Sequence, residues 1–315
     1  HTALKQLRRE FNGTRWFVEG DIKGCFDNIN HAVLVGLLNN KIKDARITKL
    51  IYKFLKAGYL ENWQYHKTYS GTPQGGIISP LLANIYLHEL DKFVMKLKSE
   101  FDTPGVGQST PEYRELHNEI KRLSHRLTKV TGEEREMVLA EYKPKRQKLM
   151  TIPCTAQTDK KLKYVRYADD FLIAVKGNRE DCQWIKSKLA EFIGDTLKME
   201  LSEDKTLITH SSKCARFLGY DVRVRRSGKI KRGGPGHVKM RTLNGGVELL
   251  VPLNDKIRQF VFTKGVAIQK KDGSMFPVHR KYLVGLTDLE IVSVYNAELR
   301  GICNYYGMAS NFCKL

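Results

Sequence analysis

Three aspartates from two distant parts of the chain have the type and setting for metal-dependent chemistry. Asp21 lies near the end of a predicted strand, 16–22, whereas Asp169 and Asp170 fall in the turn of a predicted strand–turn–strand segment, 164–175. If these strands are neighbours in one sheet, the three carboxylates converge. Clustered carboxylates repel one another unless cations neutralise them, and hard oxygen ligands select Mg²⁺ or Mn²⁺.

Two such ions can activate an attacking hydroxyl and stabilise a leaving oxygen in phosphoryl transfer. An Asp-Asp pair in a hairpin turn is otherwise ordinary turn chemistry. The flanking apolar strands and the distant Asp21, at a second strand end, favour the metal site over that alternative.

The elements that must position these residues follow from apolar spacing and capping residues. Asn30 is predicted to cap a helix at 31–40, Ser79 a long helix that has Pro80 in its first turn, and Asn178 a helix that ends near 193. The spacing also predicts a helix at 47–57, an extended hairpin at 59–70, and strands near 199–209 and 216–224. This order favours an α+β fold in which an antiparallel sheet is backed by helices.

The charge balance points to a polyanionic partner. The 315 residues carry 54 Lys and Arg against 34 Asp and Glu, for a net charge of +20, and basic side chains on phosphates release condensed counterions. Residues 223–241 hold eight basic residues and no acid among four glycines and a proline, which predicts a mobile basic loop that binds RNA. Residues 101–163 hold 13 basic and 9 acidic residues. Within this stretch, the mixed charges of 121–163 fit an RNA-binding surface and a solvated face equally well.

Other compositional features narrow the class of protein. No apolar run reaches about 18 residues, so no membrane partner is expected. The six cysteines form no CxxC pair, which indicates a reducing compartment and neither a disulfide framework nor a zinc site.

Five motifs, in order along the chain, resemble those of reverse transcriptases. They are DIKGCFD at 21–27, GTPQGGIISPLLANIYLHELD at 71–91, YADD at 167–170, LSEDK at 201–205 and FLGY at 217–220. The second has the form used by group II intron-encoded maturases. Viral RNA-dependent RNA polymerases are another candidate class, but they usually carry GDD in place of YADD, so this motif argues against them.

The resemblance implies a right-hand polymerase palm with fingers elements, a charged helical insertion and the start of a thumb. It implies that Asp21, Asp169 and Asp170 bind two Mg²⁺ ions, with Mn²⁺ as a substitute, and that Ile22 offers a backbone carbonyl.

The resemblance also implies how the substrates are held. Phe26 would be a steric gate that favours dNTPs, and Gln74, Gly75 and Lys205 would contact the nucleotide. A primer grip would comprise Phe217, Leu218, Gly219 and Tyr220. From charge, the candidate RNA-binding residues are Arg223, Arg225, Arg226, Lys229, Lys231 and Arg232.

The expected organisation follows these motifs. It comprises partial fingers and the first part of the palm at 1–100, the charged helical insertion at 101–163, the YADD palm and primer grip at 164–222, a basic loop and palm-to-thumb connection at 223–285, and a truncated start of the thumb at 286–315. The motifs expected before His1 are missing, so the chain is interpreted as a piece of a longer protein.

Two functions remain open at this point. The first is an RNA-directed DNA polymerase that also binds intron RNA as a maturase. The second is an RNA-binding splicing cofactor with little polymerase activity. The three clustered acids argue against it, because nothing structural would require them. An enzyme of another reverse transcriptase lineage is a further alternative. Expected partners are intron and template RNA, a DNA primer or target, and dNTPs, with homodimer formation left open. A bacterial cytoplasmic ribonucleoprotein is expected, with an organellar matrix as the alternative.

Overall fold

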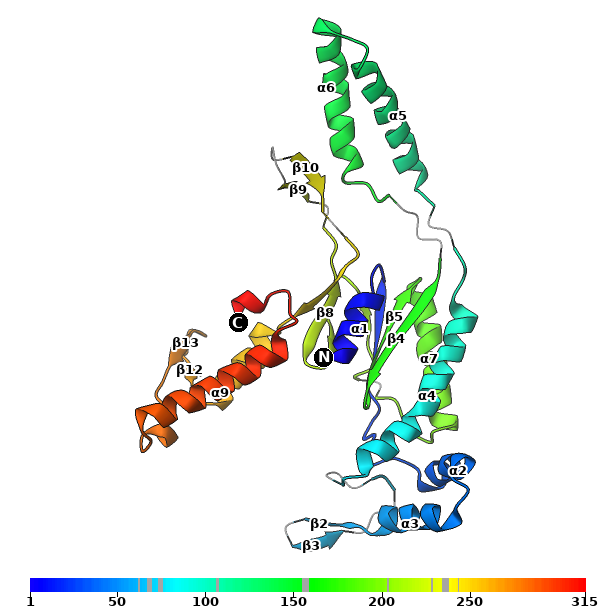
Figure 1. Cartoon of the computed structure of the whole chain (residues 1–315), viewed down its shortest axis with the longest axis vertical. Coiled ribbons are helices and arrows are strands. Elements are labelled where there is room, and N and C mark those ends of the chain that lie inside the picture. The colour runs from blue at the N-terminus through cyan, green and yellow to red at the C-terminus, as the bar shows by residue number, and fades with distance from the viewer. Residues whose placement is uncertain are drawn as a thin grey trace.

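A computed structural model of the chain describes residues 1–61, 63–66, 70–72, 76–105, 108–154, 159–202, 204–227, 229–233, 238–242 and 244–315. Its centre is an antiparallel four-stranded sheet in the order β4-β5-β1-β6 (Figure 1). These strands are β4 (Lys161–Tyr167), β5 (Asp170–Lys176), β1 (Trp16–Gly20) and β6 (Ile208–His210). The sheet therefore brings the two predicted aspartate-bearing segments next to each other, as adjacent strands.

Both faces of the central sheet are buried, because successive side chains along a strand point to opposite faces. On β5, Phe171, Ile173 and Val175 belong to one apolar cluster, and Leu172 and Ala174 to another. The first cluster lies under α2 (His31–Lys41), α3 (Ala45–Lys56), α4 (Ser79–Phe101) and α7 (Arg179–Asp195). The second joins α1 (Thr2–Glu10) to a three-stranded sheet of β7 (Ala215–Phe217), β8 (Tyr220–Val224) and β11 (Val247–Leu250).

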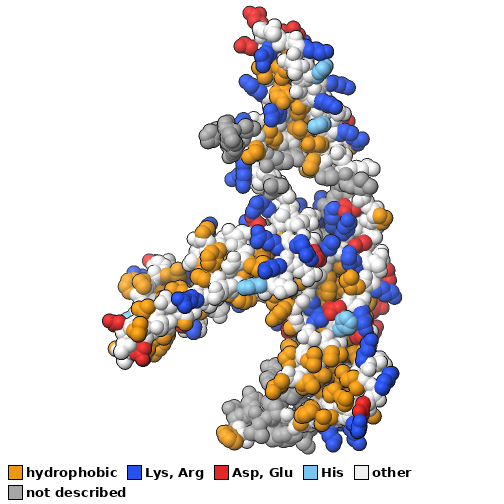
Figure 2. Space-filling view, viewed as in Figure 1, with side chains coloured by type: hydrophobic (Ala, Val, Ile, Leu, Met, Phe, Trp, Pro, Cys, Tyr) orange, Lys and Arg blue, Asp and Glu red, His pale blue; other side chains and the backbone are white. Residues whose placement is uncertain are grey.

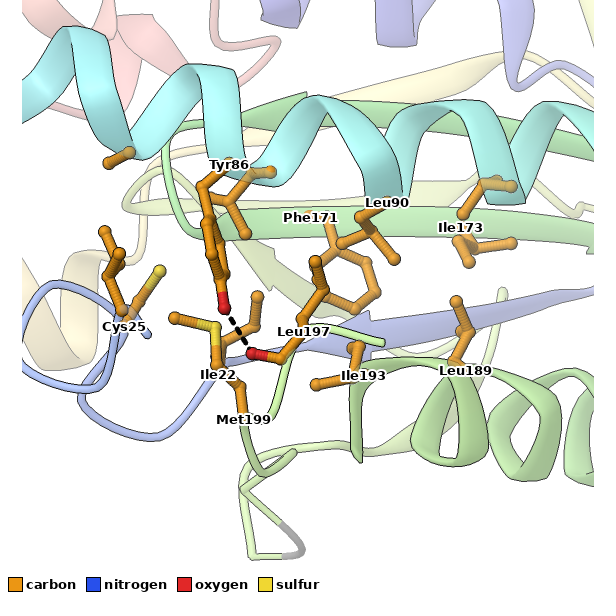
Figure 3. Close-up of a cluster of buried hydrophobic side chains, with 14 of the residues drawn as sticks. Ile22, Cys25, Tyr86, Leu90, Phe171, Ile173, Leu189, Ile193, Leu197 and Met199 are labelled. Atoms are coloured by element: carbon orange, nitrogen blue, oxygen red, sulfur yellow. Dashed lines mark hydrogen bonds between the residues drawn. The ribbon is translucent and has the colours of Figure 1, made fainter. Parts of the chain in front are cut away.

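The first cluster supports the strand ends directly. Figure 3 shows Tyr86 and Leu90 of α4 on one side of it and Leu189 and Ile193 of α7 on the other. The hydroxyl of Tyr86 donates to the backbone carbonyl of Leu197. Both long helices are thereby tied to the segment that passes beside Ile22 and Cys25.

Several pieces project from this body, and two of them are a helical hairpin and the C-terminal elements (Figure 1). A helical hairpin of α5 (Pro111–Leu127) and α6 (Gly132–Leu149) extends away from the sheet (Figure 1). It buries only a few apolar side chains among the described residues, at Ile120, Leu123 and Val138. Figure 2 shows Lys and Arg side chains distributed over it, together with acidic ones at its tip.

The second projecting piece contains the C-terminal elements. They are a π-helical turn at Leu253–Ile257, α8 (Arg258–Thr263), the hairpin of β12 (Ala267–Gln269) and β13 (Met275–Pro277), short 3-10 turns at Lys281–Leu283 and Phe312–Lys314, and α9 (Asp288–Tyr306). The end of α9 returns to the second apolar cluster through Tyr306. In the described part of the chain, no helix is long and apolar enough to cross a membrane.

Capping residues set several helix ends as the sequence predicts. The Asn30 side chain accepts from two backbone amides of α2, and Asn178 and Asp181 form a capping box on α7. Ser79 is not an N-cap, because Ile78 before it already has helical backbone angles and occupies that position. Pro144 does not break α6, although it lies inside the helix.

The predicted strands differ in extent from the observed ones. A small hairpin of β2 (Tyr59–Glu61) and β3 (Gln64–His66) occupies part of 59–70. Of the predicted strand at 199–209, only Ile208 and Thr209 join the sheet, as part of β6, and Leu201 makes an isolated bridge to Ile22. The chain turns between these two contacts, which brings Lys205 back toward the strand ends.

Candidate active site

Asp21 and Asp170 are placed by the pairing of β1 with β5. The two strands are antiparallel, with Gly20 opposite Phe171, so Asp21 follows the end of one strand and Asp170 begins the other. A side chain at residue 20 would not fit, because its Cβ would overlap the Phe171 ring. Glycine at this position therefore leaves room for the Phe171 ring against β1, at the residue before Asp21.

Asp169 is held by a two-residue turn between β4 and β5. Tyr167 pairs with Asp170, which leaves Ala168 and Asp169 as the turn itself, here called the YADD turn. Ala168 has a φ of 54°, in the left-handed region that non-glycine residues adopt at a cost. Backbone strain of this kind clusters at active sites and ligand-binding sites of proteins.

The electrostatic surroundings show that the three carboxylates influence one another. Burial, followed by the charges of Asp169 and Asp21, raises the pKa of Asp170. The buried Cys25 thiol responds to the same field: burial and then the Asp169 charge are the largest causes that raise its pKa to about 12. The site is therefore a region of concentrated negative charge.

Lys205 is a basic side chain that enters this region and contacts one of the carboxylates. Its Nζ lies 3.0 Å from an Asp21 carboxylate oxygen. The hydrogen bond and charge of Asp21 raise the pKa of Lys205, with smaller contributions from Asp170 and Asp169. The Lys205 side chain is 70% exposed, so it can reach the solvent side of the carboxylates.

An open pocket of about 870 Å³ lies over these groups. Asp21, Asp169, Lys205 and Phe26 all line it, although Asp170 does not. Phe26 is partly buried against the first apolar cluster, so its ring is both packed and accessible from the pocket.

The carboxylate oxygens of Asp21, Asp169 and Asp170 are suitable ligands for a divalent cation, although the three side chains are not grouped around one point. Among the described residues, no three His, Cys, Asp or Glu side chains are grouped tightly enough to hold a metal. Asp21 contacts Lys205. A cation would offset the mutual repulsion that raises the Asp170 pKa, and carboxylate oxygens are its preferred ligands.

The backbone of Ile22, next to Asp21, pairs with Leu201 without using the Ile22 carbonyl. The bridge between Ile22 and Leu201 is made by two bonds, from the Ser202 amide to the Asp21 carbonyl and from the Lys23 amide to the Glu200 carbonyl. The carbonyl of Ile22 takes no part in this bridge and points away from Leu201.

The glycine-rich segment before α4 begins in contact with the DIKGCFD motif at 21–27 and with the residues that follow it. The Gly71 amide donates to Ile29, the Thr72 amide donates to Phe26, and a His31 ring nitrogen lies 2.6 Å from the Gly71 carbonyl. Gly71 has a φ of 82°, and a Cβ there would lie 2.5 Å from the Asp27 carbonyl oxygen. Gln74 and Gly75, predicted to contact the nucleotide, lie outside the described residues.

FLGY forms a second two-residue turn, and only its ends belong to strands. Phe217 of β7 pairs with Tyr220 of β8, and both are buried. Leu218 and Gly219 form the turn, here called the FLGY turn, with φ values of 46° and 71°.

Two tyrosines of α9 hold the FLGY turn. The Tyr305 hydroxyl donates to the Leu218 carbonyl at 2.7 Å and the Tyr306 hydroxyl to the Gly219 carbonyl at 3.3 Å. The Tyr220 hydroxyl in turn donates to the Tyr305 carbonyl. Burial, and then the Asp170 charge, raises the pKa of Tyr305, so this contact lies near the carboxylates.

The basic segment 223–241 is not the single mobile loop that composition predicts. β8 continues through Val224, and β9 (Ile230–Gly233) pairs with β10 (Val238–Arg241) as a ribbon. Arg223 and Arg225 both bind Glu248 of β11, at 2.9 and 2.6 Å. Residues 223–241 contain no acidic residue, but the neighbouring strand β11 supplies Glu248 as a partner for these arginines.

The remaining candidate RNA-binding residues separate into two kinds. Arg226 donates to the Thr14 carbonyl and to the Ser211 hydroxyl, so it is also used within the fold. Lys229 and Lys231 are exposed. The Arg232 side chain lies outside the described part of the chain.

Sequence reasoning missed the side chains that hold the two turns. Arg166 of β4 contacts Asp91 of α4 and the Ala168 carbonyl, while Tyr305 and Tyr306 hold the FLGY turn. One signal was available for Arg166. It follows Leu162 and Tyr164 at alternate positions on the face of β4 that packs against α4, where a charged residue calls for a partner.

Comparison with known proteins agrees with this geometry. A family described as "Reverse transcriptase (RNA-dependent DNA polymerase)" matches residues 2–102 and 143–222. The chain is 73% identical over 315 residues to "Group II intron-encoded protein LtrA" from Lactococcus lactis subsp. cremoris, covering 100% of this chain and 52% of that protein. It is 34% identical over 324 residues to "Putative COX1/OXI3 intron 1 protein" from Saccharomyces cerevisiae, covering 100% of this chain and 37% of that protein.

Among solved structures, a telomerase from Candida albicans aligns with a TM-score of 0.40 and 13% identity, over 73% of this chain and 33% of that one. The chain spans about half the length of the Lactococcus relative, with which it aligns from end to end. The chain belongs to the reverse transcriptase family.

Proposed function

We propose that this chain carries the polymerising centre of an RNA-directed DNA polymerase that also binds intron RNA as a maturase. The observation that carries the proposal is the convergence of Asp21 with Asp169 and Asp170 on paired strand ends, beside Lys205 and an open pocket. Family membership supports the reaction class.

The carboxylates are the groups that would hold the metal ions. Asp21, Asp169 and Asp170, with the Ile22 carbonyl, would bind two Mg²⁺ ions, for which Mn²⁺ is a substitute. Metal ions bound there would activate the primer hydroxyl and stabilise the leaving oxygen. The strands and the YADD turn fix the direction of the carboxylates before substrate arrives, which lowers the cost of positioning.

Two further side chains would act on the incoming nucleotide. Lys205 would neutralise the charge of the triphosphate, and its support is that it is an exposed ammonium group 3.0 Å from Asp21. Phe26 presents an aromatic ring in the pocket wall, where it would conflict with a ribose 2′-hydroxyl and favour dNTPs.

The proposed partners are intron and template RNA, a DNA primer or target, and dNTPs. The net charge of +20 and the exposed Lys229 and Lys231 support contact with phosphates. A relative named "Nuclear intron maturase 1, mitochondrial" from Arabidopsis thaliana, 23% identical, supports the maturase part of this proposal. The assembly would be a ribonucleoprotein of the bacterial cytoplasm.

Primer extension by the full-length protein tests the proposal. A DNA primer annealed to an RNA template is supplied with dNTPs and Mg²⁺, and wild type is compared with Asp21→Asn and Asp169→Asn. Both variants are expected to lose extension while keeping RNA affinity. The matched control is Asp195→Asn, an exposed acid at the end of α7, which is expected to behave as wild type. Extension at wild-type rates by both site variants would contradict the proposal.

A further inference from the structure

The YADD turn is fastened to α4 by one guanidinium group. Arg166 Nε and Nη2 donate to the two carboxylate oxygens of Asp91, at 2.8 and 2.7 Å. Its remaining terminal nitrogen, Nη1, donates to the Ala168 carbonyl at 2.7 Å and to the Asn84 side-chain oxygen at 3.2 Å. A single side chain thus joins the helix to the backbone of the residue directly before Asp169.

The partner that orients Arg166 is itself fixed. Asp91 accepts a further bond from the Tyr164 hydroxyl at 2.8 Å, so β4 contacts it at two positions. Tyr164 and Arg166 lie on the same face of β4, and Asn84 and Asp91 are two helical turns apart on α4. The side chains of Tyr164 and Arg166 on β4 therefore face those of Asn84 and Asp91 on α4.

The contact is strong because it is charged and largely removed from water. The Arg166 side chain is 11% exposed and that of Asp91 is 28% exposed. Burial alone would raise the Asp91 pKa, but the hydrogen bonds and charge of Arg166, with the Tyr164 hydroxyl, together lower it. Two parallel N–H···O bonds also fix the plane of the guanidinium, which a lysine cannot reproduce.

We propose that Arg166, locked by Asp91, is a positioning residue that holds the strained YADD turn in the conformation from which Asp169 acts. This rests on the proposed function. Ala168 adopts a left-handed φ of 54° without the freedom of glycine, so the turn needs an outside contact to stay there. The Ala168 carbonyl, held by Arg166, is that contact.

The proposal predicts a defect in rate that is separate from any defect in binding. Arg166→Lys keeps the charge but loses the fork. The single-turnover rate of dNTP addition, normalised to the active fraction, is expected to fall about 10- to 100-fold, because small displacements of catalytic groups have effects of this size. The template-primer Kd is expected to be unchanged. Arg46→Lys is the matched control, since Arg46 makes a similar fork with Asp44 at the start of α3.

The strain of Ala168 gives a second, independent comparison. Glycine adopts positive φ readily, so a glycine at residue 168 reduces the need for the fastening. The fold-loss caused by Arg166→Lys, measured within the Ala168→Gly background, is therefore expected to be smaller than in wild type. Equal losses in the two backgrounds, or a normalised rate unaffected by Arg166→Lys, would overturn the proposal.

Hydrogen exchange supplies a readout that does not depend on activity. Backbone amides in the peptide 167–171 are expected to exchange faster in Arg166→Lys than in wild type, with no change in Arg46→Lys. If exchange is unchanged in Arg166→Lys, the positioning role is wrong even if the protein polymerises. If exchange increases but wild type and Asp169→Asn extend primers equally, the proposed function fails and the fastening of the turn stands.

Discussion

The YADD turn and the FLGY turn are built to the same plan but fastened by different chemistry. Each is a two-residue turn between paired strands, each contains a non-glycine residue with positive φ, and each has a carbonyl held by a side chain from outside the turn itself. Ala168 is held by a charged guanidinium locked to α4, whereas Leu218 is held by the neutral hydroxyl of Tyr305 on α9.

The difference reflects what each turn carries. The YADD turn bears Asp169 next to Asp170, in a region where like charges oppose one another, so a displaced turn would relieve repulsion. A charge-assisted fork resists that tendency better than a neutral bond. The FLGY turn carries no charge and is fastened to α9, where Tyr305 is 47% exposed. We therefore expect changes at the first turn to affect chemistry and changes at the second to affect primer placement.

The largest effect is expected from Asp170→Asn, in opposite directions for activity and stability. Extension should fall about a thousand-fold or more, since several kcal/mol of transition-state stabilisation are removed. The metal-free protein should become more heat-stable at neutral pH, because burial and neighbouring charges oppose ionised Asp170. Thermal unfolding in EDTA, with and without added Mg²⁺, measures this, and Mg²⁺ should stabilise wild type more than the variant.

The sign of the pH dependence follows from the raised pKa of Asp170. A carboxyl whose pKa is raised by folding favours the folded state below its unfolded pKa and loses that contribution as pH rises through the folded pKa. The stability advantage of Asp170→Asn in EDTA should therefore shrink as pH falls toward 4. An advantage that grows on acidification would show that the carboxylates do not repel one another as described.

The next largest effect is expected for sugar selection at the pocket beside the YADD turn. Phe26→Val should reduce the preference for dNTP over the matched rNTP by roughly ten- to a hundred-fold, because the ring that conflicts with the 2′-hydroxyl is removed. Incorporation of each nucleotide by the full-length protein measures the ratio. An unchanged ratio would make Phe26 a packing residue of the first apolar cluster.

A smaller effect is expected at the FLGY turn. Tyr305→Phe removes one neutral hydrogen bond and should lower the free energy of unfolding by about 0.5–1.5 kcal/mol. It should raise the Kd for primer-template more than it lowers the rate of addition. Tyr306→Phe, whose bond is longer at 3.3 Å, should have less effect. Tyr295→Phe is the control on the same helix, because it keeps the ring that lies against Arg280.

The smallest effect is expected from the basic segment. Replacing Lys229 and Lys231 by Gln should change how strongly salt weakens RNA binding. The slope of the logarithm of the RNA association constant against the logarithm of salt concentration should flatten by about 0.7 for each phosphate of single-stranded RNA that the protein no longer neutralises. Replacing Arg223 and Arg225 should change the slope less and lower stability more, because both bind the buried Glu248. Equal changes in slope for the two pairs would remove the distinction between them.

The residues that the sequence identified most clearly are those whose position follows from strand ends and caps. The adjacency of Asp21 to the YADD turn is predicted from two strand-end motifs, and Asn30 and Asn178 from capping chemistry. These features depend on neighbours in the chain or on alternation along a strand. They also depend on motifs that resemble a known family.

What the sequence did not predict are contacts set by the three-dimensional arrangement. Glu248 neutralises Arg223 and Arg225 from a different strand, and Tyr305 reaches Leu218 across 87 residues. Arg166 and Asp91 are 75 residues apart, and their contact requires both the register of β4 and the rotation of α4. Local patterns indicate that a buried charge needs a partner but not which residue supplies it.

Iron-mediated cleavage tests most directly whether Asp21 and the YADD turn form one metal centre. Fe²⁺ exchanged for Mg²⁺ in the full-length protein, with ascorbate and peroxide, generates radicals that cut backbone close to the ion. Two cut positions are predicted, one near residues 20–23 and the other near 167–171, both absent in Asp169→Asn and retained in Asp195→Asn. Cuts confined to one of these segments, or a pattern unchanged by Asp169→Asn, would contradict the assignment of a shared centre.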